Sequence, residues 1–204
     1  ITASEVGVMT TLTDLARNSA PRNVAADIGR LFGEALATKQ DKDLTALFNG
    51  FDSALGDGTG AITTASIFNA ASTLRANALN LNDSAVVLHP KIAYDLKANL
   101  TNTFANPNGG ELQNEAMRSG YVGSLAGLRI FETSNMSNSG NVGDYIGAAI
   151  HKDALAIAMM QDVKIETQRD ASLRADEIVA TSIYGVGEIH DTYGVQLRFD
   201  SSIQ

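Results

Sequence analysis

The most extensive helical pattern of apolar residues lies near the start of the chain, in residues 20–49. The spacing predicts one long helix whose apolar stripe contains Val24, Ile28, Leu31, Phe32, Ala35 and Leu36. Ser19 is the expected N-terminal cap, Pro21 would lie in the first turn, and Gly50 would end the helix. Such a helix would be about 40 Å long at 1.5 Å per residue.

Two glycines, Gly29 and Gly33, lie one turn apart inside this predicted helix. Each costs up to about 1 kcal/mol relative to alanine. Either another backbone passes close to them, or the helix simply tolerates the cost.

Residues 1–14 mix Thr, Val and Gly without helical periodicity, which predicts an extended arm or one half of a hairpin. We expect the partner strand to lie upstream. The chain begins at Ile1, so either a protease has cut it there or upstream residues lie outside this sequence.

The remaining pattern predicts helices first and strands later. Helices are expected at 64–80, 91–100 and 111–118, with a short buried strand, AVVL, before His89-Pro90. Loops are expected at 101–111 and 134–144, the latter the most flexible by composition. Further strands are LRIFET, YIGAAI, LAIAM, VKIETQ, DEIVATSIYGVGEI and GVQLRFD. This order favours an α+β fold class over a doubly wound sheet.

Composition and charge exclude several classes of function. The 204 residues carry a net charge of -8, so a clustered basic surface for gripping nucleic acid is not indicated. The absence of cysteine excludes disulfides, thiol catalysis and cysteine-based zinc sites. No apolar run approaches the ~20 residues that span a bilayer, so no membrane partner is expected.

No local motif indicates catalysis, a cofactor or a metal. The three histidines, His89, His151 and His190, lie far apart, and no G-x-S-x-G pattern occurs. The GDGTG run at 56–60 has no following lysine and no clear preceding strand, so a hinge is favoured over a phosphate cradle. A calcium loop from Asp52 and Asp57 would lack the later glutamate ligand. We therefore predict a protein that is not an enzyme and has no catalytic, cofactor-binding or metal-binding residues.

The charged turn RDASLRAD, between two predicted strands, is the remaining candidate site. Its charges alternate in sign through Arg169, Asp170, Arg174 and Asp176. In a generic protein this would be a solvated turn, because exposed ion pairs contribute only ~0–1 kcal/mol. In a self-assembling protein the same residues would exchange ion pairs with a neighbouring subunit.

Four longer segments carry a resemblance to a known family. They read NVAADIGRLFGEALATKQDKDLTAL, SAVVLHPKIAYDLKANL, GYVGSLAGLRIFETSNM and AAIHKDALAIAMMQDVKIETQRDASLRADEIVATSIYGVGEIHDTYGVQLRF. In order, they resemble the spine helix, the strand–His-Pro–helix phrase, the following strand pair and the return strands of tailed-bacteriophage major capsid proteins. That family has the Hong Kong 97-like fold.

The resemblance implies a layout with a long spine helix, a peripheral-domain sheet and an axial α/β domain. Residues 1–14 would be the returning half of an extended loop. Residues 15–58 and 160–190 would form the peripheral domain, and residues 59–159 and 191–204 the axial domain.

The implied function is structural. Copies of the chain would assemble into hexamers and pentamers of an icosahedral shell that encloses phage double-stranded DNA without sequence recognition. Portal, scaffolding and decoration proteins would be further partners. The protein would belong to the virion and assemble in the host bacterial cytoplasm. Two alternatives stay open: an encapsulin-like nanocompartment, and a small-molecule enzyme of α+β class with paired titratable groups in a deep pocket.

Overall fold

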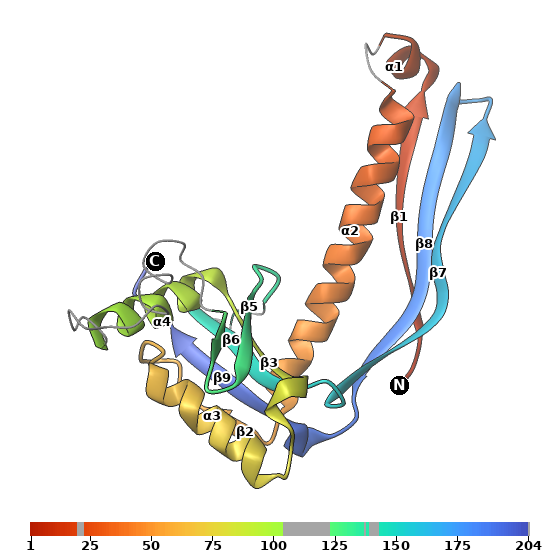
Figure 1. The fold of residues 1–204 in the computed structure, drawn as a ribbon. Coiled ribbons are helices and arrows are strands. Elements are labelled where there is room, and N and C mark those ends of the chain that lie inside the picture. Colours follow the sequence, from red (N-terminus) through yellow and green to blue (C-terminus); the bar gives the residue numbers. More distant parts are fainter. Residues whose placement is uncertain (20–22, 104–122, 137, 139–142, 204) are drawn as a thin grey trace. The chain divides into compact units, whose positions relative to one another are not determined.

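The computed structural model describes residues 1–19, 23–103, 123–136, 138 and 143–203. The chain divides into two compact units, one of residues 1–44 and 156–187, the other of residues 45–155 and 188–204 (Figure 1). The mixture of helices and strands confirms the α+β class. The names peripheral and axial domain stay a prediction.

The first unit is a three-stranded sheet with a long helix beside it. The strand order is β1 (Ser4–Thr13), β8 (Ala175–Glu188), β7 (Leu155–Asp170), and the helices are α1 (Asp14–Ser19) and α2 (Val24–Ala46). β1 is antiparallel to β8, from Ser4 opposite Tyr184 to Thr13 opposite Ala175. The extended arm is thus confirmed. In the described chain β1 pairs with β8, a distant segment that the local pattern could not reveal, and the expected upstream strand stays a prediction.

The long helix is confirmed, but it begins later than expected. The side-chain oxygen of Asn23 accepts the N–H of Ala26 at 3.4 Å, which is a capping contact before Val24. The hydroxyl of Ser19 donates to the carbonyl of Leu15 at 2.6 Å and so belongs to the end of α1. The expected cap at Ser19 is therefore wrong, and Pro21 lies outside the described residues. α2 has 23 residues and passes into a 3-10 turn, η1 (Leu47–Gly50).

Only part of the predicted stripe on α2 is buried. The buried cluster of this unit consists of Leu12, Phe32, Leu36, Ile178 and Ala180, with Val6, Val8, Val24 and Ile28 partly buried against it. Leu31 and Ala35 are exposed, because the helix packs on β1 and β8 along a face narrower than its apolar stripe. At one end of this face the hydroxyl of Tyr184 donates to Asp43 at 2.8 Å. Burial, reinforced by Asp43, raises the pKa of Tyr184 to about 12.

The two helix glycines have open surroundings within this chain. In the described residues, no heavy atom outside the local helix lies within 4 Å of a Cβ built at Gly29 or Gly33. A close backbone from the described part of the chain therefore does not explain them.

The second unit is built on a six-stranded mixed sheet. The strand order is β2 (Ser53–Leu55), β9 (Gly194–Asp200), β6 (Asp144–His151), β3 (Ser84–Leu88), β5 (Leu128–Glu132), β4 (Ser124–Leu125). The pairs β2–β9 and β3–β5 are parallel, and the other neighbours are antiparallel. Short 3-10 turns, η2 (Leu81–Asp83) and η3 (Asp191–Tyr193), precede β3 and β9.

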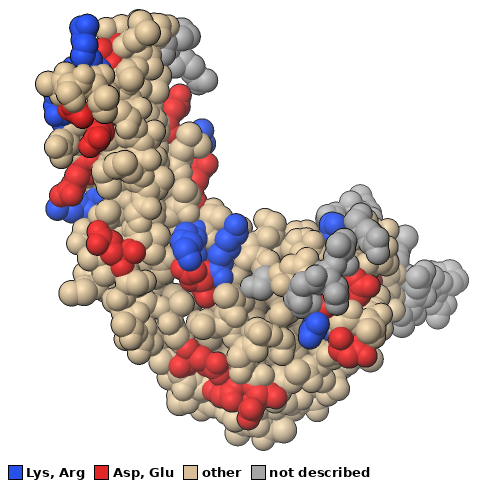
Figure 2. Space-filling model, turned by 180° about the vertical axis from the view of Figure 1, so that it is seen from behind, with Lys and Arg blue, Asp and Glu red and all other residues tan. Residues whose placement is uncertain are grey.

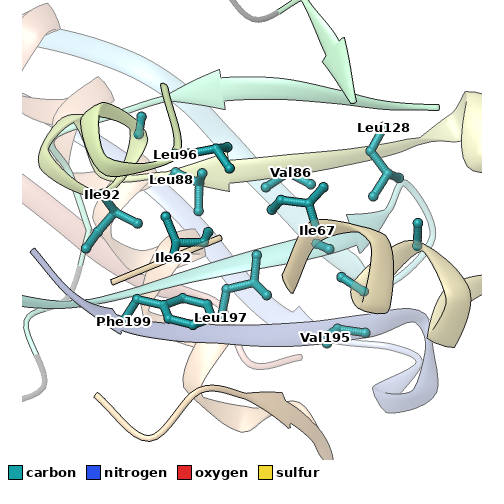
Figure 3. Packing of buried hydrophobic residues seen from close by; sticks show 14 of the residues in the cluster. Ile62, Ile67, Val86, Leu88, Ile92, Leu96, Leu128, Val195, Leu197 and Phe199 are labelled. Carbon is teal, nitrogen blue, oxygen red and sulfur yellow. The ribbon is translucent and has the colours of Figure 1, made fainter. Parts of the chain in front are cut away.

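Two helices, α3 (Thr64–Ala76) and α4 (Pro90–Thr103), pack on one face of this sheet. Figure 3 shows Ile67, Leu96 and Val86 among the side chains that converge between helices and strands. A second cluster contains Phe48, Phe51, Ile146, Ala148 and Ala154. Clusters built from alternate residues of β6 bury both faces of the sheet, which explains why β6 and β9 are buried almost throughout.

Several predicted boundaries are corrected. α3 ends at Ala76 and not at residue 80, since Ala78 adopts a left-handed φ of 59°. α4 extends through Thr103. The two strands predicted from LAIAM and VKIETQ form one strand, β7. The expected helix at 111–118 lies outside the described residues, as do most of the expected loop at 101–111 and part of the one at 134–144.

Candidate assembly surfaces

The charged turn joins β7 to β8 and forms an ion-pair network with the start of α1. The guanidinium of Arg169 donates to both carboxylate oxygens of Asp14, at 2.8 and 2.7 Å, and to Asp176 at 3.1 Å. The other oxygen of Asp176 accepts from Arg17 at 3.0 Å. Four alternating charges therefore connect the hairpin tip to the chain segment that follows β1.

The turn itself is held by local hydrogen bonds. One oxygen of Asp170 accepts from the backbone N–H of Ser172 at 2.8 Å, from its hydroxyl at 2.6 Å and from the N–H of Leu173 at 3.2 Å. Arg174 has a left-handed φ of 48°, and its carbonyl accepts the N–H of Asp14 at 3.0 Å. These bonds fix the conformation of a tip that is largely exposed.

The network keeps its groups charged. The hydrogen bond from Arg169 lowers the pKa of Asp14, with smaller contributions from the positive charges of Arg169, Arg174 and Arg17. Hydrogen bonds to Asp14 and Asp176 raise the pKa of Arg169. The hydroxyl of Ser172 lowers the pKa of Asp170. The tip therefore presents fixed charges at neutral pH.

Of the four residues predicted for this site, Arg169 and Asp176 contact each other, and Asp170 and Arg174 shape the turn. Within the described residues, Arg174 makes no ion pair. Sequence reasoning missed Asp14 and Arg17, for which the only signal was an acid and a base three residues apart where the arm ends. The role of the tip between subunits stays a prediction.

A second exposed surface runs along β7, an edge strand. Ile157, Met159, Val163 and Ile165 are 41–53% exposed, although they occupy the alternate positions of one strand face. β8, in contrast, alternates between buried and half-buried residues. The cluster beneath α2 contains residues of β1 and β8 but none of β7. Among the residues that the structure describes, β7 therefore carries an uncovered apolar strip, which we define as these four residues.

The glycine-rich loop at 56–60 is occupied by the protein's own groups. Gly56 and Gly58 have φ values of 88° and 80°, and the N–H of Gly58 donates to the carbonyl of Arg198 at 3.3 Å. A carboxylate oxygen of Asp144, which is paired with Arg198, lies 2.6 Å from a Cβ built at Gly58. The negative charge of Asp144 would repel a phosphate group in this loop. The expectation that no strand precedes the loop is wrong, because the short strand β2 does.

Two of the three histidines pack on one tyrosine: the ring centroids of His151 and His190 lie 5.8 and 4.6 Å from that of Tyr193. His89 stacks on Tyr145 with ring centroids 3.6 Å apart, and burial lowers its pKa. His151 is buried at the end of β6 beside Tyr193. Among the residues that the structure describes, no group of three His, Cys, Asp or Glu side chains is placed to hold a metal.

Sequence reasoning missed one carboxyl cluster, which joins residues far apart in the chain. Burial, followed by a hydrogen bond with Asp191, raises the pKa of Glu188, and the charge of Asp52 adds to this effect. The N–H of Asp52 donates to Asp191 at 2.6 Å. Glu188 therefore keeps its proton to a higher pH than an exposed glutamate does.

A long helix beside a hairpin sheet, joined in one chain to a mixed-sheet unit, is the fold of capsid shell subunits, as structural comparison shows. The structure of a Mycobacterium phage Che8 chain matches with a TM-score of 0.76 and 24% identity, covering 95% of this chain and 70% of that one. The capsid of Cyanophage P-SCSP1u matches with a TM-score of 0.77 and 18% identity, covering 97% and 72%. The SrpI encapsulin of Synechococcus elongatus PCC 7942 matches with a TM-score of 0.72 and 11% identity, covering 98% and 75%.

A family model described as phage capsid protein matches residues 1–197, and this chain belongs to that family. No curated protein matches the sequence. The protein is a structural capsid protein of the virion, as the resemblance implied. No helix among the described residues is long and apolar enough to cross a membrane.

Proposed function

We propose that copies of this chain assemble into hexamers and pentamers of an icosahedral shell that encloses phage double-stranded DNA. The observation that carries the proposal is the family match over residues 1–197. The finer assignments come from the resemblance: residues 1–14 as the returning half of an extended loop, 15–58 and 160–190 as the peripheral domain, and 59–159 and 191–204 as the axial domain.

The two units support such an assembly. A closed shell requires each subunit to make several different contacts with identical copies. The first unit offers two exposed surfaces for this purpose, the hairpin tip and the apolar strip of β7. Individually weak contacts suffice, because many act together in a closed particle.

Charge supports enclosure of DNA without sequence recognition. The chain carries a net charge of -8. On the face drawn in Figure 2, Lys and Arg lie in small groups interspersed with Asp and Glu. A surface of this kind releases few phosphate counterions, so DNA would be contained and not tightly bound.

The remaining assignments follow from the same reading. Assembly takes place in the host bacterial cytoplasm, with portal, scaffolding and decoration proteins as further partners. Shell formation requires no catalytic step and no cofactor.

The test is production of the chain in bacteria, followed by sedimentation and negative-stain imaging. Closed particles with hexameric and pentameric units are expected, with nuclease-protected DNA in particles isolated from infected cells. Full-length protein that stays monomeric at high concentration, with and without scaffolding and portal proteins, would refute the proposal.

An encapsulin-type compartment is a second candidate, favoured by the fold match to the SrpI encapsulin. Both candidates predict shells, and their contents differ. Particles from native cells that contain a specific protein and no DNA would favour the compartment over the phage capsid.

The hairpin tip supplies a sharper test of the contacts between subunits. Arg174→Glu reverses a charge that makes no ion pair in the described chain and contributes only a small attraction to Asp14, so we expect impaired assembly with a melting temperature close to that of the wild type. Arg169→Glu also breaks the ion pairs with Asp14 and Asp176, so it should lower both the particle yield and the melting temperature of the subunit. Normal particle yield from Arg174→Glu would remove the tip from the assembly contacts.

A further inference from the structure

β7 combines three features: it lies at the edge of its sheet, it is 16 residues long, and its apolar strip is uncovered. Figure 1 shows α2 alongside β1, with β8 and then β7 further from the helix. A long strand of this kind is a template for pairing with another strand, and proteins usually block such edges unless they are used.

The opposite side of the same strand carries charges of alternating sign. Alternation places Asp162, Lys164 and Glu166 together, and the 2.5 Å contact between Lys164 and Glu166 confirms that these two share a side. Asp162 accepts the N–H of Val163 at 2.7 Å, and in the described part of the chain it makes no ion pair. The pattern acid–base–acid is complementary to itself in an antiparallel arrangement.

We propose that β7 pairs antiparallel with β7 of a second copy across a twofold axis, with Val163 opposite Val163 and Asp162 opposite Lys164. The proposal rests on the proposed shell function and names one of its contacts. Two three-stranded sheets become one six-stranded sheet, and the contact is isologous, as a twofold axis requires.

The charges distinguish this register from its neighbours. A shift that places Lys164 opposite itself also places Asp162 opposite Glu166, and directly opposed like charges destabilise a strand pair. A one-residue shift would place the apolar strip of one copy beside the charged side of the other. A register with Ile165 opposite Ile165 would place Lys164 opposite Glu166 of the other copy. Lys164 already contacts Glu166 within its own chain, and Asp162 would face the uncharged Gln168.

In the proposed register Asp162 gains a cation, and each lysine lies between two carboxylates. On the other side, Met159 faces Thr167 and Gln161 faces Ile165. The Val163 side chains of the two copies then meet at the centre, and Ile165 of each copy lies diagonally next to Val163 of the other. The two strips touch at this centre and extend away from it in opposite directions.

The absence of cysteine permits a direct test of the register. Met160 lies opposite Glu166 in this pairing, so Met160→Cys/Glu166→Cys should form disulfide-linked dimers when assembled protein is oxidised. Within one chain the two positions are about 20 Å apart along the strand, too far for a disulfide. The matched control Met160→Cys/Gln168→Cys corresponds to the register with opposed lysines and should stay monomeric on a non-reducing gel.

Charge exchange provides a second readout. Asp162→Lys or Lys164→Asp alone places like charges opposite each other twice per twofold contact, and association should weaken on the order of tenfold. The double variant Asp162→Lys/Lys164→Asp restores opposite charges and should recover wild-type particle yield.

The outcomes separate this proposal from the shell function. Assembled wild-type shells, with a Met160→Cys/Glu166→Cys variant that stays uncrosslinked, would overturn β7 pairing and leave the shell function intact. Crosslinking of the control variant would overturn the register, as would a double charge variant no better than the single ones. Failure of the wild-type chain to assemble at all would overturn the proposed function itself.

Discussion

The small core beneath α2 yields the most quantitative prediction, which concerns Leu36. This side chain is 3% exposed and packs in a cluster with Phe32, Leu12, Ile178 and Ala180. Leu36→Ala removes three carbon atoms, which cost about 2.4 kcal/mol at ~0.8 kcal/mol each. Incomplete collapse of the resulting cavity raises the expected loss to about 3 kcal/mol. A loss of this size is a large fraction of the ~5–15 kcal/mol that stabilises a typical domain.

Leu31→Ala is the matched control, because it makes the same substitution on the same helix. Leu31 is 52% exposed, so only about half of the transfer free energy applies and no closed cavity forms. The higher helix propensity of alanine offsets part of this lost transfer free energy. We expect a loss of about 1 kcal/mol or less.

Hydrogen–deuterium exchange of unassembled subunits measures both variants, since it reports the opening of α2, β1 and β8 separately from the second unit. Leu36→Ala should accelerate exchange in these segments on the order of a hundredfold, and Leu31→Ala by less than about tenfold. Equal acceleration in the two variants, or unchanged exchange in Leu36→Ala, would refute the assigned packing face of α2.

Four other predictions test individual contacts. Asn23→Ala should cost about 1 kcal/mol in thermal unfolding, and Asn23→Asp should retain most of the capping contact. Arg169→Met should raise the pKa of Asp14, measured by carboxylate NMR. Because this pKa is lowered in the folded chain, the contribution of Asp14 to the free energy of unfolding is present above the unfolded pKa of 3.8 and is lost as the pH falls through the folded pKa. The Arg169→Met variant should therefore lose less stability in acid than the wild type does. Gly33→Ala should stabilise the subunit by up to ~1 kcal/mol, and impaired assembly would then locate a neighbouring copy. Gly56→Ala should destabilise the second unit in urea unfolding, since its Cβ would lie 2.1 Å from the carbonyl oxygen of Arg198; unchanged unfolding would contradict the loop geometry.

The elements with strong periodicity were predictable, and their ends were not. The helical stripe around Phe32 located α2, but Ser19 and Asn23 are both good caps four residues apart, and only the folded contact selects Asn23. β7 was divided in the prediction because polar residues occur at Gln161 and Asp162. An edge strand tolerates such residues, since much of its surface stays in water.

The candidate site was likewise predictable only in part. Alternating charges identified the turn around Arg169, because a polar run between two alternating segments is typical of a hairpin tip. Its main partner, Asp14, lies 155 residues away, and no local pattern connects the two. Glu188 and Asp191 lie close in sequence, yet only the folded structure shows that burial raises the pKa of Glu188.

The sequence by itself determined the α+β class, the identity and order of most helices and strands, and the resemblance to capsid proteins. These properties depend on the period of apolar residues and on the order of the segments along the chain. The tertiary structure alone decided that β1 pairs with β8, which side of α2 is buried, and that β7 is an edge that no other described residue covers. Those outcomes depend on which surfaces from distant segments bury each other away from water. A surface that stays exposed can be identified only once the other contacts of the fold are known.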